Sequence, residues 1–509
     1  MGIMNTFVDR HTGQIRGVLS CFDRVEITGT LPDLCHAGAM ATYLGARAIR
    51  LFDYPRWAEP FRDELRAHAE QLAQEAGVPI EFIRRVKDFR KEERIKRLVA
   101  QRGGHSGLVH IFSAMEPCPS FRPWHDKRTG KTGLKPTEAK CLHYYFYFIH
   151  PALGLCYLRV PTWAPFRLQL YCNGHHVLAR QLTRAGIAYP LLDNAFVDMA
   201  DWARAQTLAD TWAIRRLHRH LDRLAATYCP VLRHFPAGVH WSLMQVEYAT
   251  DVVCARQAEF PPLYEALTHT AIHAVKPAHV ATFLGRKLTG AYQDEVGNDF
   301  STRIEGARIK HPMGWAAIKL YDKVGLIDRV ECTATDVTCF QHHRTVEHRD
   351  GTREFKLAPV RKSIDSLPVL RERLGAATHR YLDFLAAIED PRPGLRALEK
   401  IATPVHEGER SYRGFNLFHG PDLDLFRTIL RGEVTISGFQ ARQLREHLSR
   451  LSGAQLSRLL KRFRTHGLLK KIGKRYKYYL TTLGRTVATA ALKLRELGIS
   501  PMLNQPVAA

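Results

Sequence analysis

The sequence lacks any hydrophobic run long enough to cross a membrane. No stretch of about 18 or more apolar residues occurs. Residues 1–16 also lack the basic and then apolar order of a secretion signal. We therefore expect a soluble, cytoplasmic chain without a membrane partner.

The common patterns for zinc and nucleotide binding are missing as well. The ten cysteines form no CxxC pair and no paired Cys/His spacing, so we expect reduced thiols in apolar cores. The segment Gly130-Lys131-Thr132 resembles the end of a phosphate-binding loop, but His125 stands where that loop needs glycine. The sequence therefore does not predict a nucleotide site of this type.

Positive charge is abundant and unevenly distributed. The 509 residues include 74 Lys and Arg against 50 Asp and Glu, a net charge of +24. Residues 421–509 hold 17 of these cations and 5 of the acids, a net charge of +12. Such a balance favours a polyanionic partner.

A chain of this length with 45% hydrophobic content can bury several cores, so we expect more than one domain. Strand-like and helix-like hydrophobic periodicities both occur, which predicts an α+β multidomain chain. In the N-terminal α/β region, strand-like and helical patterns alternate, beginning with a strand pair over 14–31 and a helix over 55–77. The central α+β domain begins with a hairpin over 140–162 and includes a three-stranded antiparallel meander over 300–333. The predicted divisions are an N-terminal region 1–116, a basic Pro/Gly-rich loop 117–139, a central domain 140–402, a linker 403–420 and a C-terminal module 421–509.

The C-terminal module carries two helix-start signals fifteen residues apart. Ser437 to Gln440 and Ser452 to Gln455 both match the capping box, which predicts helices over about 438–448 and 453–466. This is helix-turn-helix spacing. A basic hairpin over 468–480 and a helix over about 483–497 follow.

The segment LSRLLKRFRTHGLLKKIGKRYKYYLTTLGR resembles the winged-helix domain of MarR-like bacterial regulators. The resemblance implies binding of double-stranded DNA, with the second helix in the major groove and the hairpin as the wing. The wing is short and no flanking pair of dimerisation helices is evident, so the oligomeric state and any effector stay open. The predicted DNA-binding residues are Gln455, Ser457, Arg458, Lys461, Arg462 and Arg464 on the helix and Lys470, Lys471, Lys474, Arg475 and Lys477 on the wing.

The meander over 300–333 carries a candidate catalytic group. Period-two alternation places Lys319, Tyr321 and Lys323 on one face of one strand, with Arg329 and Glu331 on the next. A tyrosine between cations, beside a carboxylate that holds a divalent ion, suits attack on a phosphodiester. This pattern resembles rolling-circle replication initiators and predicts Tyr321, Glu331 and Lys323 as catalytic. The alternative is an exposed sheet face held by salt bridges.

Two-metal nuclease or transposase chemistry needs carboxylates that converge around the metals. Glu247 and Asp251 would share a face if their segment is helical, and with Glu331 they are the predicted metal ligands. The full set of candidate acids is Asp23, Glu116, Glu247, Asp251, Glu305 and Glu331. Each has the alternative role of a solvated or capping acid.

These patterns predict a DNA-binding protein, either a bacterial transcriptional regulator or a DNA-handling protein of a mobile element. The alternative is a metal-dependent DNA nicking enzyme, resembling a replication initiator or transposase, which would use Mg²⁺ or Mn²⁺. No cofactor is expected for the regulator. Single-stranded DNA is a second candidate partner, because aromatic side chains on the hairpin over 140–162 can stack on unpaired bases: Tyr144, Tyr145, Tyr147 and Tyr157.

Overall fold

The chain forms two compact units, residues 1–389 and residues 390–509, which are described separately. The computed structural model describes residues 5–84, 89–286, 299–303, 306–389, 399–416, 419–430, 439–448, 451–472 and 477–493. Among these residues, none of the helices combines the length and apolarity needed to span a lipid bilayer.

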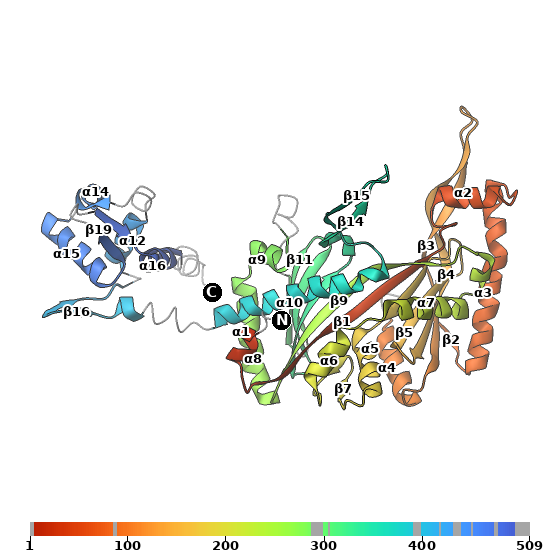
Figure 1. Ribbon diagram of the computed structural model, residues 1–509, viewed down its shortest axis with the longest axis horizontal. Helices are drawn as coiled ribbons and strands as arrows, with labels where there is room; N and C mark the ends of the chain where they lie inside the picture. Colours follow the sequence, from red (N-terminus) through yellow and green to blue (C-terminus); the bar gives the residue numbers. More distant parts are fainter. Residues whose placement is uncertain are drawn as a thin grey trace, which may run out of the picture. The chain divides into compact units, whose positions relative to one another are not determined.

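Unit 1 is a mixed α/β structure built on one large sheet (Figure 1). Eleven described strands follow the order β10-β11-β12-β13-β9-β1-β6-β5-β4-β3-β2, and only β2 and β3 pair in parallel. The strands of the first half are β1 (Ile15–Thr30), β2 (Ile80–Phe82), β3 (Gly107–His125), β4 (Thr132–His150), β5 (Gly154–Pro161) and β6 (Leu168–Cys172). Those of the second half are β9 (His240–Cys254), β10 (Asp299–Arg303), β11 (Gly306–Met313), β12 (Ala316–Lys323) and β13 (Ile327–Ala334).

The two halves of the sheet repeat one chain path. In each half a long strand leads into helices, then into an antiparallel meander whose last strand returns to pair with the first. The first connection contains α2 (Ala37–Gly45), α3 (Tyr54–Ala76) and α4 (Lys91–Arg102), and the second contains α8 (Phe260–Ala274) and α9 (Pro277–Phe283). The helices α5 (Gly174–Arg184) and α10 (Leu367–Glu389) follow the two meanders. The long strands β1 and β9 pair antiparallel and join the halves.

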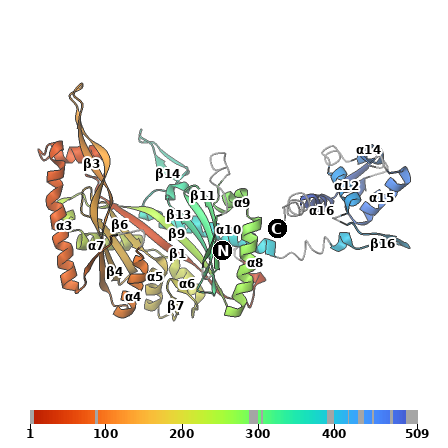
Figure 2. The same cartoon turned by 180° about the vertical axis from the view of Figure 1, so that it is seen from behind.

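Both faces of the sheet are covered, but unequally. One face packs against the main core, to which α3, α7 (Ile214–Tyr228) and α10 contribute. On the other face, Leu19 and Cys21 of β1 pack against α5 and α6 (Trp202–Ala209), and Phe112 and Tyr147 pack against α4. Figures 1 and 2 show α4, α5 and α6 grouped along one side of unit 1. Asp251 and Glu247 of β9 also lie on this second face, because Asp251 is paired with Leu19 and residues four apart on a strand point the same way.

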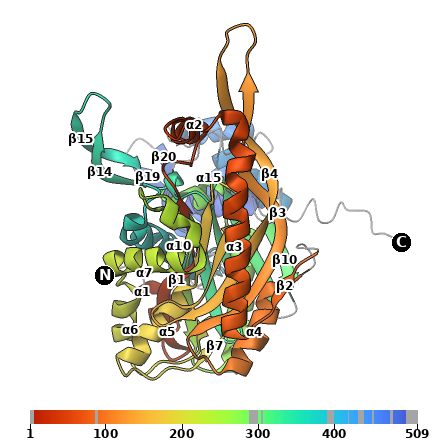
Figure 3. The same cartoon turned by 90° about the vertical axis from the view of Figure 1, so that its right-hand side faces the viewer.

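Two predictions for the N-terminal half are wrong. Residues 14–31 form the single strand β1 rather than a strand pair. Residues 117–139 are not a loop between domains, because they form the outer parts of β3 and β4, which belong to the same sheet as both flanking regions. Proline is tolerated there because β2 pairs with β3 only as far as Ser113, so the outer part of β3 is an edge strand. Figure 3 shows this hairpin projecting from unit 1.

The other predicted elements of unit 1 agree with the structure. The meander over 300–333 is antiparallel as predicted, but the stretch expected to be its first strand is divided into β10 and β11, so the described meander has four strands instead of three. The helix over 55–77 and the hairpin over 140–162 are present as α3 and as β4 with β5. The remaining short elements are α1 (Asn5–Arg10), β7 (Leu191–Leu192), β8 (Ala195–Phe196) and the hairpin of β14 (Gln341–Glu347) and β15 (Arg353–Pro359).

Unit 2 has its own apolar core and a three-stranded sheet in the order β18-β20-β19. Its elements are β16 (Val405–Glu407), β17 (Arg410–Tyr412), α12 (Gly420–Ile429), β18 (Phe439–Gln440), α14 (Ala441–His447), α15 (Gly453–Thr465), β19 (Leu469–Ile472), β20 (Lys477–Leu480) and α16 (Thr482–Lys493). The capping box at Ser452 and Gln455 and the following hairpin agree with the prediction.

Two boundaries in unit 2 differ from the prediction. The helix predicted from 438 begins at Ala441, because Phe439 and Gln440 pair with β20 and Gln440 forms the capping box. The linker predicted over 403–420 belongs to unit 2, since Phe415 is buried in its core beside Phe463.

Candidate metal centre

Asp23 reaches the polar face of the sheet because β1 bulges at this residue. Phe22 pairs with Tyr248 and Arg24 pairs with Glu247, so the register with β9 shifts at Asp23. One inserted residue reverses the alternation of side chains beyond it. Asp23 and Arg24 therefore share the polar face, although they are neighbours in sequence.

Three carboxylates converge on this face. Asp23 of β1, Glu247 of β9 and Glu331 of β13 each bring one oxygen to within 4.8 Å of the others. Only 9%, 9% and 2% of these residues is exposed. Oxygen ligands in an octahedral Mg²⁺ shell lie about 3 to 4 Å apart, so small side-chain movements would let all three bind one ion. Hard oxygen donors of this kind suit Mg²⁺ or Mn²⁺.

The strand β12 supplies two further groups to the same place. Lys319 pairs across the sheet with Glu331, as the alternating pattern predicts. Its Nζ donates to Glu331 Oε1 at 2.6 Å and to Glu247 Oε1 at 3.4 Å. The hydroxyl of Tyr321 donates to Glu331 Oε2 at 2.7 Å. Both oxygens of Glu331 are thus oriented by β12.

Lys323, predicted to be catalytic, does not join this group. Its Nζ donates to Asp193 Oδ2 at 2.8 Å, in the turn between β7 and β8. Four residues along a strand span about 13 Å, which separates Lys323 from Lys319 although both lie on one face. The structure therefore places Lys323 beside the metal centre rather than in it.

Asp251, predicted as a metal ligand with Glu247, is held in an ion pair instead. Their segment is the strand β9 and not a helix, so the two carboxylates are about 13 Å apart along the strand. Asp251 accepts from Arg329 Nε at 2.6 Å and from Arg329 Nη2 at 2.7 Å. Asp23, from the sequence's wider set of acids, completes the cluster in its place.

Arg329 is fully buried and organises the back of the site. Besides Asp251, it donates to the carbonyl of Asn194 at 2.7 Å and to Asp23 Oδ1 at 3.4 Å. His175 Nε2 lies 3.3 Å from Asp251 Oδ2. A buried guanidinium needs such partners because removing it from water is costly. No sequence pattern predicts that Arg329 is buried.

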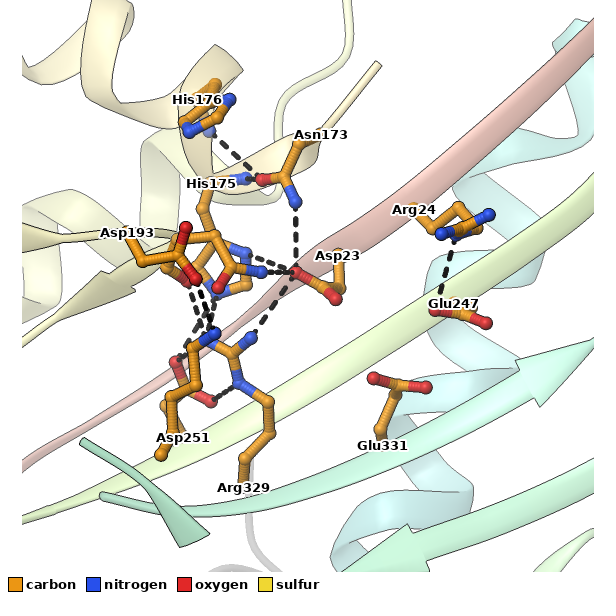
Figure 4. Close-up of polar contacts among 12 residues, drawn as sticks. Asp23, Arg24, Asn173, His175, His176, Asp193, Glu247, Asp251, Arg329 and Glu331 are labelled. Carbon is orange, nitrogen blue, oxygen red and sulfur yellow. Dashed lines mark hydrogen bonds and ion pairs between the residues drawn. The ribbon is translucent and has the colours of Figure 1, made fainter. Parts of the chain in front are cut away.

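The N-terminus of α5 orients the carboxylate of Asp23. The Asn173 side chain accepts from the amides of His175 and His176 and so caps α5, while its Nδ2 donates to Asp23 Oδ1 at 3.1 Å. Asn194 Nδ2 donates to the same oxygen at 2.5 Å. In Figure 4 the second oxygen of Asp23 points toward Glu247 and Glu331. Each hydrogen bond to Asp23 within the described residues uses Oδ1 and leaves Oδ2 for another ligand.

The surroundings shift the proton affinities in opposite directions. Burial would raise the pKa of Asp23, but Arg329 and the bonds from His175 and Asn173 lower it far below its usual value. Burial and the neighbouring Glu331 raise the pKa of Glu247. Burial, together with Glu331, also raises the pKa of Tyr321 well above 10.0, so its hydroxyl keeps its proton at neutral pH.

A cavity of about 840 Å³ opens beside the carboxylates. Asp23, Arg24 and Glu247 are among the residues that line it. Its wall includes Lys96, Arg180 and Lys323 among the cations and Tyr147, Tyr157 and Tyr171 among the aromatic side chains. The cavity is large enough for a nucleotide, and its lining brings cationic side chains together with two of the three carboxylates, Asp23 and Glu247.

The other two candidate acids do not belong to the centre. Glu116 Oε1 accepts from Tyr145 at 2.7 Å and its Oε2 accepts from Arg159 at 2.7 Å, so both carboxylate oxygens have hydrogen-bond partners. Glu305 lies outside the described residues.

In unit 2, part of the predicted DNA-binding set is exposed. Gln455, Ser457, Arg458 and Arg464 of α15 and Lys470 of β19 are exposed, whereas Lys471 and Lys477 are half-buried. Lys474 and Arg475 lie outside the described residues.

Two cations of α15 have other partners. Arg462 is 7% exposed and donates to Asp422 Oδ1 at 3.1 Å and to the carbonyl of Gly414 at 2.6 Å, so its predicted contact with DNA is wrong. It holds the segment before α12 against the core of unit 2. Lys461 is half-buried and donates to Glu407 at 2.6 Å.

No family model, curated protein or solved structure matches this chain.

Proposed function

We propose that the chain is a divalent-metal-dependent enzyme that cleaves or transfers DNA phosphodiester bonds in unit 1 and holds duplex DNA through unit 2. The convergence of Asp23, Glu247 and Glu331 carries the proposal. These residues come from three adjacent strands and meet on one face.

A purely structural role explains the carboxylates less well. Replacing buried ion pairs by apolar side chains is often neutral or stabilising, so a buried cluster of charges is weak evidence for stability. Residues with strongly shifted pKa values beside a large cavity are instead typical of functional sites. Lys319 bridges Glu247 and Glu331 and so balances part of their charge.

Each group then has a defined role in the reaction. Asp23, Glu247 and Glu331 would hold the ion, which would supply charge stabilisation on the phosphate and activation of a nucleophile. Lys319 would leave one of its carboxylates and contact the phosphate, where its ammonium stabilises developing negative charge. Tyr321 positions Glu331 through its hydroxyl rather than attacking, because it keeps its proton and is 9% exposed.

Unit 2 supports the DNA-binding part of the proposal. The order of α14, α15, the β19–β20 hairpin and α16 fits a winged helix with α15 as the recognition helix. Arg458 and Arg464 are exposed on α15 and suit contacts with base edges or phosphates. This same observation favours the second candidate, a regulator that binds DNA without chemistry.

Relaxation or cleavage of supercoiled plasmid by the full chain, with Mg²⁺ or Mn²⁺ and with EDTA, tests the proposal. We expect metal-dependent strand scission that D23N, E247Q and E331Q each reduce by more than about a hundredfold, because each removes a metal ligand. The matched control is E138Q, which removes an exposed carboxylate of β4 in the same sheet. Plasmid that stays intact with both metals while the chain binds duplex DNA would favour the regulator.

A further inference from the structure

We infer that the hairpin of β3 and β4 is a second DNA-binding element, an arm that lies against the phosphates of a duplex. The arm is defined as residues 122–135. It holds five cations and one acid: Arg122, Lys127, Arg128, Lys131 and Lys135 against Asp126. The inference rests on the proposed function only in taking DNA as the polyanion.

The five cations of the arm are all exposed, and none of the ion pairs found among the described residues includes one of them. The acid is already used by the turn. Asp126 accepts from the amide of Arg128 at 2.9 Å and from the hydroxyl of Thr129 at 2.6 Å. Asp126 therefore uses both of its carboxylate oxygens within the turn.

Two of the cations face each other directly. Arg122 and Lys135 are partners across the antiparallel ladder of β3 and β4. Like charges in this position destabilise a hairpin. A bound phosphate between them would turn this repulsion into attraction. Lys135 also lies over the ring of Trp124, with its Nζ 4.8 Å from the ring centre.

The body of unit 1 orients the arm. Phe121 and Leu134 are 7% and 8% exposed and belong to the main core, so one side of the hairpin is anchored at its base. Neighbouring residues alternate between sides, so Arg122 and Lys135 face away from this anchor. The outer part of the hairpin projects beyond the neighbouring α2 in Figure 3.

A duplex suits this shape better than a flat membrane surface or a protein groove. The major groove, about 12 Å wide, admits a two-stranded β-ribbon. Prolines at 117, 119 and 123 remove amide donors from the edge of β3, which disfavours pairing with another strand. The remaining attraction is between the cations and a polyanion.

Fluorescence anisotropy of the full chain with a labelled duplex, in EDTA and over a range of NaCl concentrations, tests the arm. EDTA prevents cleavage, so the result does not depend on the metal centre. For K127Q/R128Q/K131Q we expect affinity to fall about tenfold or more, and the slope of log affinity against log salt to decrease by about 2 to 3. The control R215Q/R216Q/R219Q removes three exposed charges from α7 and should change the affinity much less.

A second variant separates DNA contact from folding. Lys135→Glu replaces the facing like charges by an opposite pair, so the melting temperature should stay the same or rise while DNA affinity falls. An arm variant with wild-type affinity and salt slope would overturn the inference, as would a preference for anionic vesicles over duplex. If the plasmid stays intact but the arm variants lose DNA affinity, the arm stands and the proposed enzymatic function fails.

Discussion

At the scale of single residues, the site depends on which carboxylates the buried Arg329 binds. Arg329 takes Asp251 through two hydrogen bonds and leaves Asp23, Glu247 and Glu331 to meet on the other side. Figure 4 shows Asp23 between these two groups. A set of paired charges and a set of converging carboxylates thus lie side by side in one sheet.

Some of these residues were predictable. Glu331 and Tyr321 belong to one face because strand alternation is a local property of the sequence. The choice between Asp23 and Asp251 was not predictable, because both are acids in apolar strands and only their partners across the sheet distinguish them. Burial of Arg462 was equally invisible, since its partner Asp422 comes from an earlier helix of unit 2.

The raised pKa of Glu247 predicts a pH-dependent metal affinity. Burial and Glu331 raise this pKa above 4.5, so protons compete with the metal at a higher pH than for an ordinary glutamate. The raised value also means that Glu247 favours the folded state at low pH, and that this contribution is lost as the pH rises through its pKa. Addition of Mn²⁺ to the metal-free chain should therefore stabilise the fold mainly at pH values above the pKa of Glu247.

Isothermal titration with Mn²⁺ between about pH 8 and about pH 5 measures this effect, because ligand protonation weakens binding. We expect the affinity to fall on acidification. E331Q should bind more weakly overall, but its loss of affinity should begin at a lower pH, because the neighbouring negative charge is gone. If the pH at which the Mn²⁺ affinity falls is the same in E331Q and in the unmodified chain, Glu247 and Glu331 do not interact.

At the scale of elements, the contact between α5 and β1 positions the site. The bulge at Asp23 lies against the first residue of α5, where a Cβ on Gly174 would come 1.9 Å from the carbonyl oxygen of Phe22. Only glycine lets the helix approach the strand this closely. The helix N-terminus then brings Asn173 and His175 to Asp23.

Gly174→Ala should therefore damage both stability and metal binding. Overpacking against a backbone atom costs about 1 to 3 kcal/mol, and relief of the clash would move α5 away from Asp23. Chemical denaturation and Mn²⁺ titration measure the two effects. The control is Gly45→Ala in α2, where no atom lies within 4 Å of the added Cβ and alanine should be neutral or stabilising. If both variants bind Mn²⁺ with equal affinity, the position of α5 does not influence metal binding.

Helices and hairpins were predictable because their signals are local. The capping box at Ser452 and the turn between β4 and β5 both lie within a few residues. The bulge in β1 has no such local signal. The alternation over residues 14–31 was therefore interpreted as two strands, although these residues form one bulged strand. Prolines in β3 suggested a loop, because an edge strand cannot be distinguished from a linker without knowing its neighbours.

At the scale of the whole molecule, the metal centre and the α15 face belong to different units. All three carboxylates and the cavity lie within residues 1–389, and the exposed cations of α15 lie within residues 390–509. Each unit has a core of its own. Sequence patterns predicted a separate C-terminal module, but they also predicted a domain boundary within unit 1. The structure has one sheet there, because β1 pairs with β6 and β9, which are far from it in the chain.

Residues 1–389 alone should keep the metal centre and lose part of the DNA affinity. We expect Mn²⁺ affinity equal to that of the full chain and weaker binding of duplex DNA. In the full chain, Arg458→Ala should weaken duplex binding by about 1 to 3 kcal/mol where it contacts a base edge, with no change in Mn²⁺ affinity. Calorimetry with Mn²⁺ and anisotropy with duplex measure the two properties. Loss of Mn²⁺ binding in the fragment would show that unit 2 contributes to the centre.

The order of the strands also governs when the centre first exists during synthesis. Asp23 lies near the start of the chain, whereas Glu331 lies in the last strand of the second meander. A polypeptide released early, before β13, lacks both the third carboxylate and the strand that covers the open edge of β9. Truncated translation products would therefore carry no assembled cluster of three carboxylates.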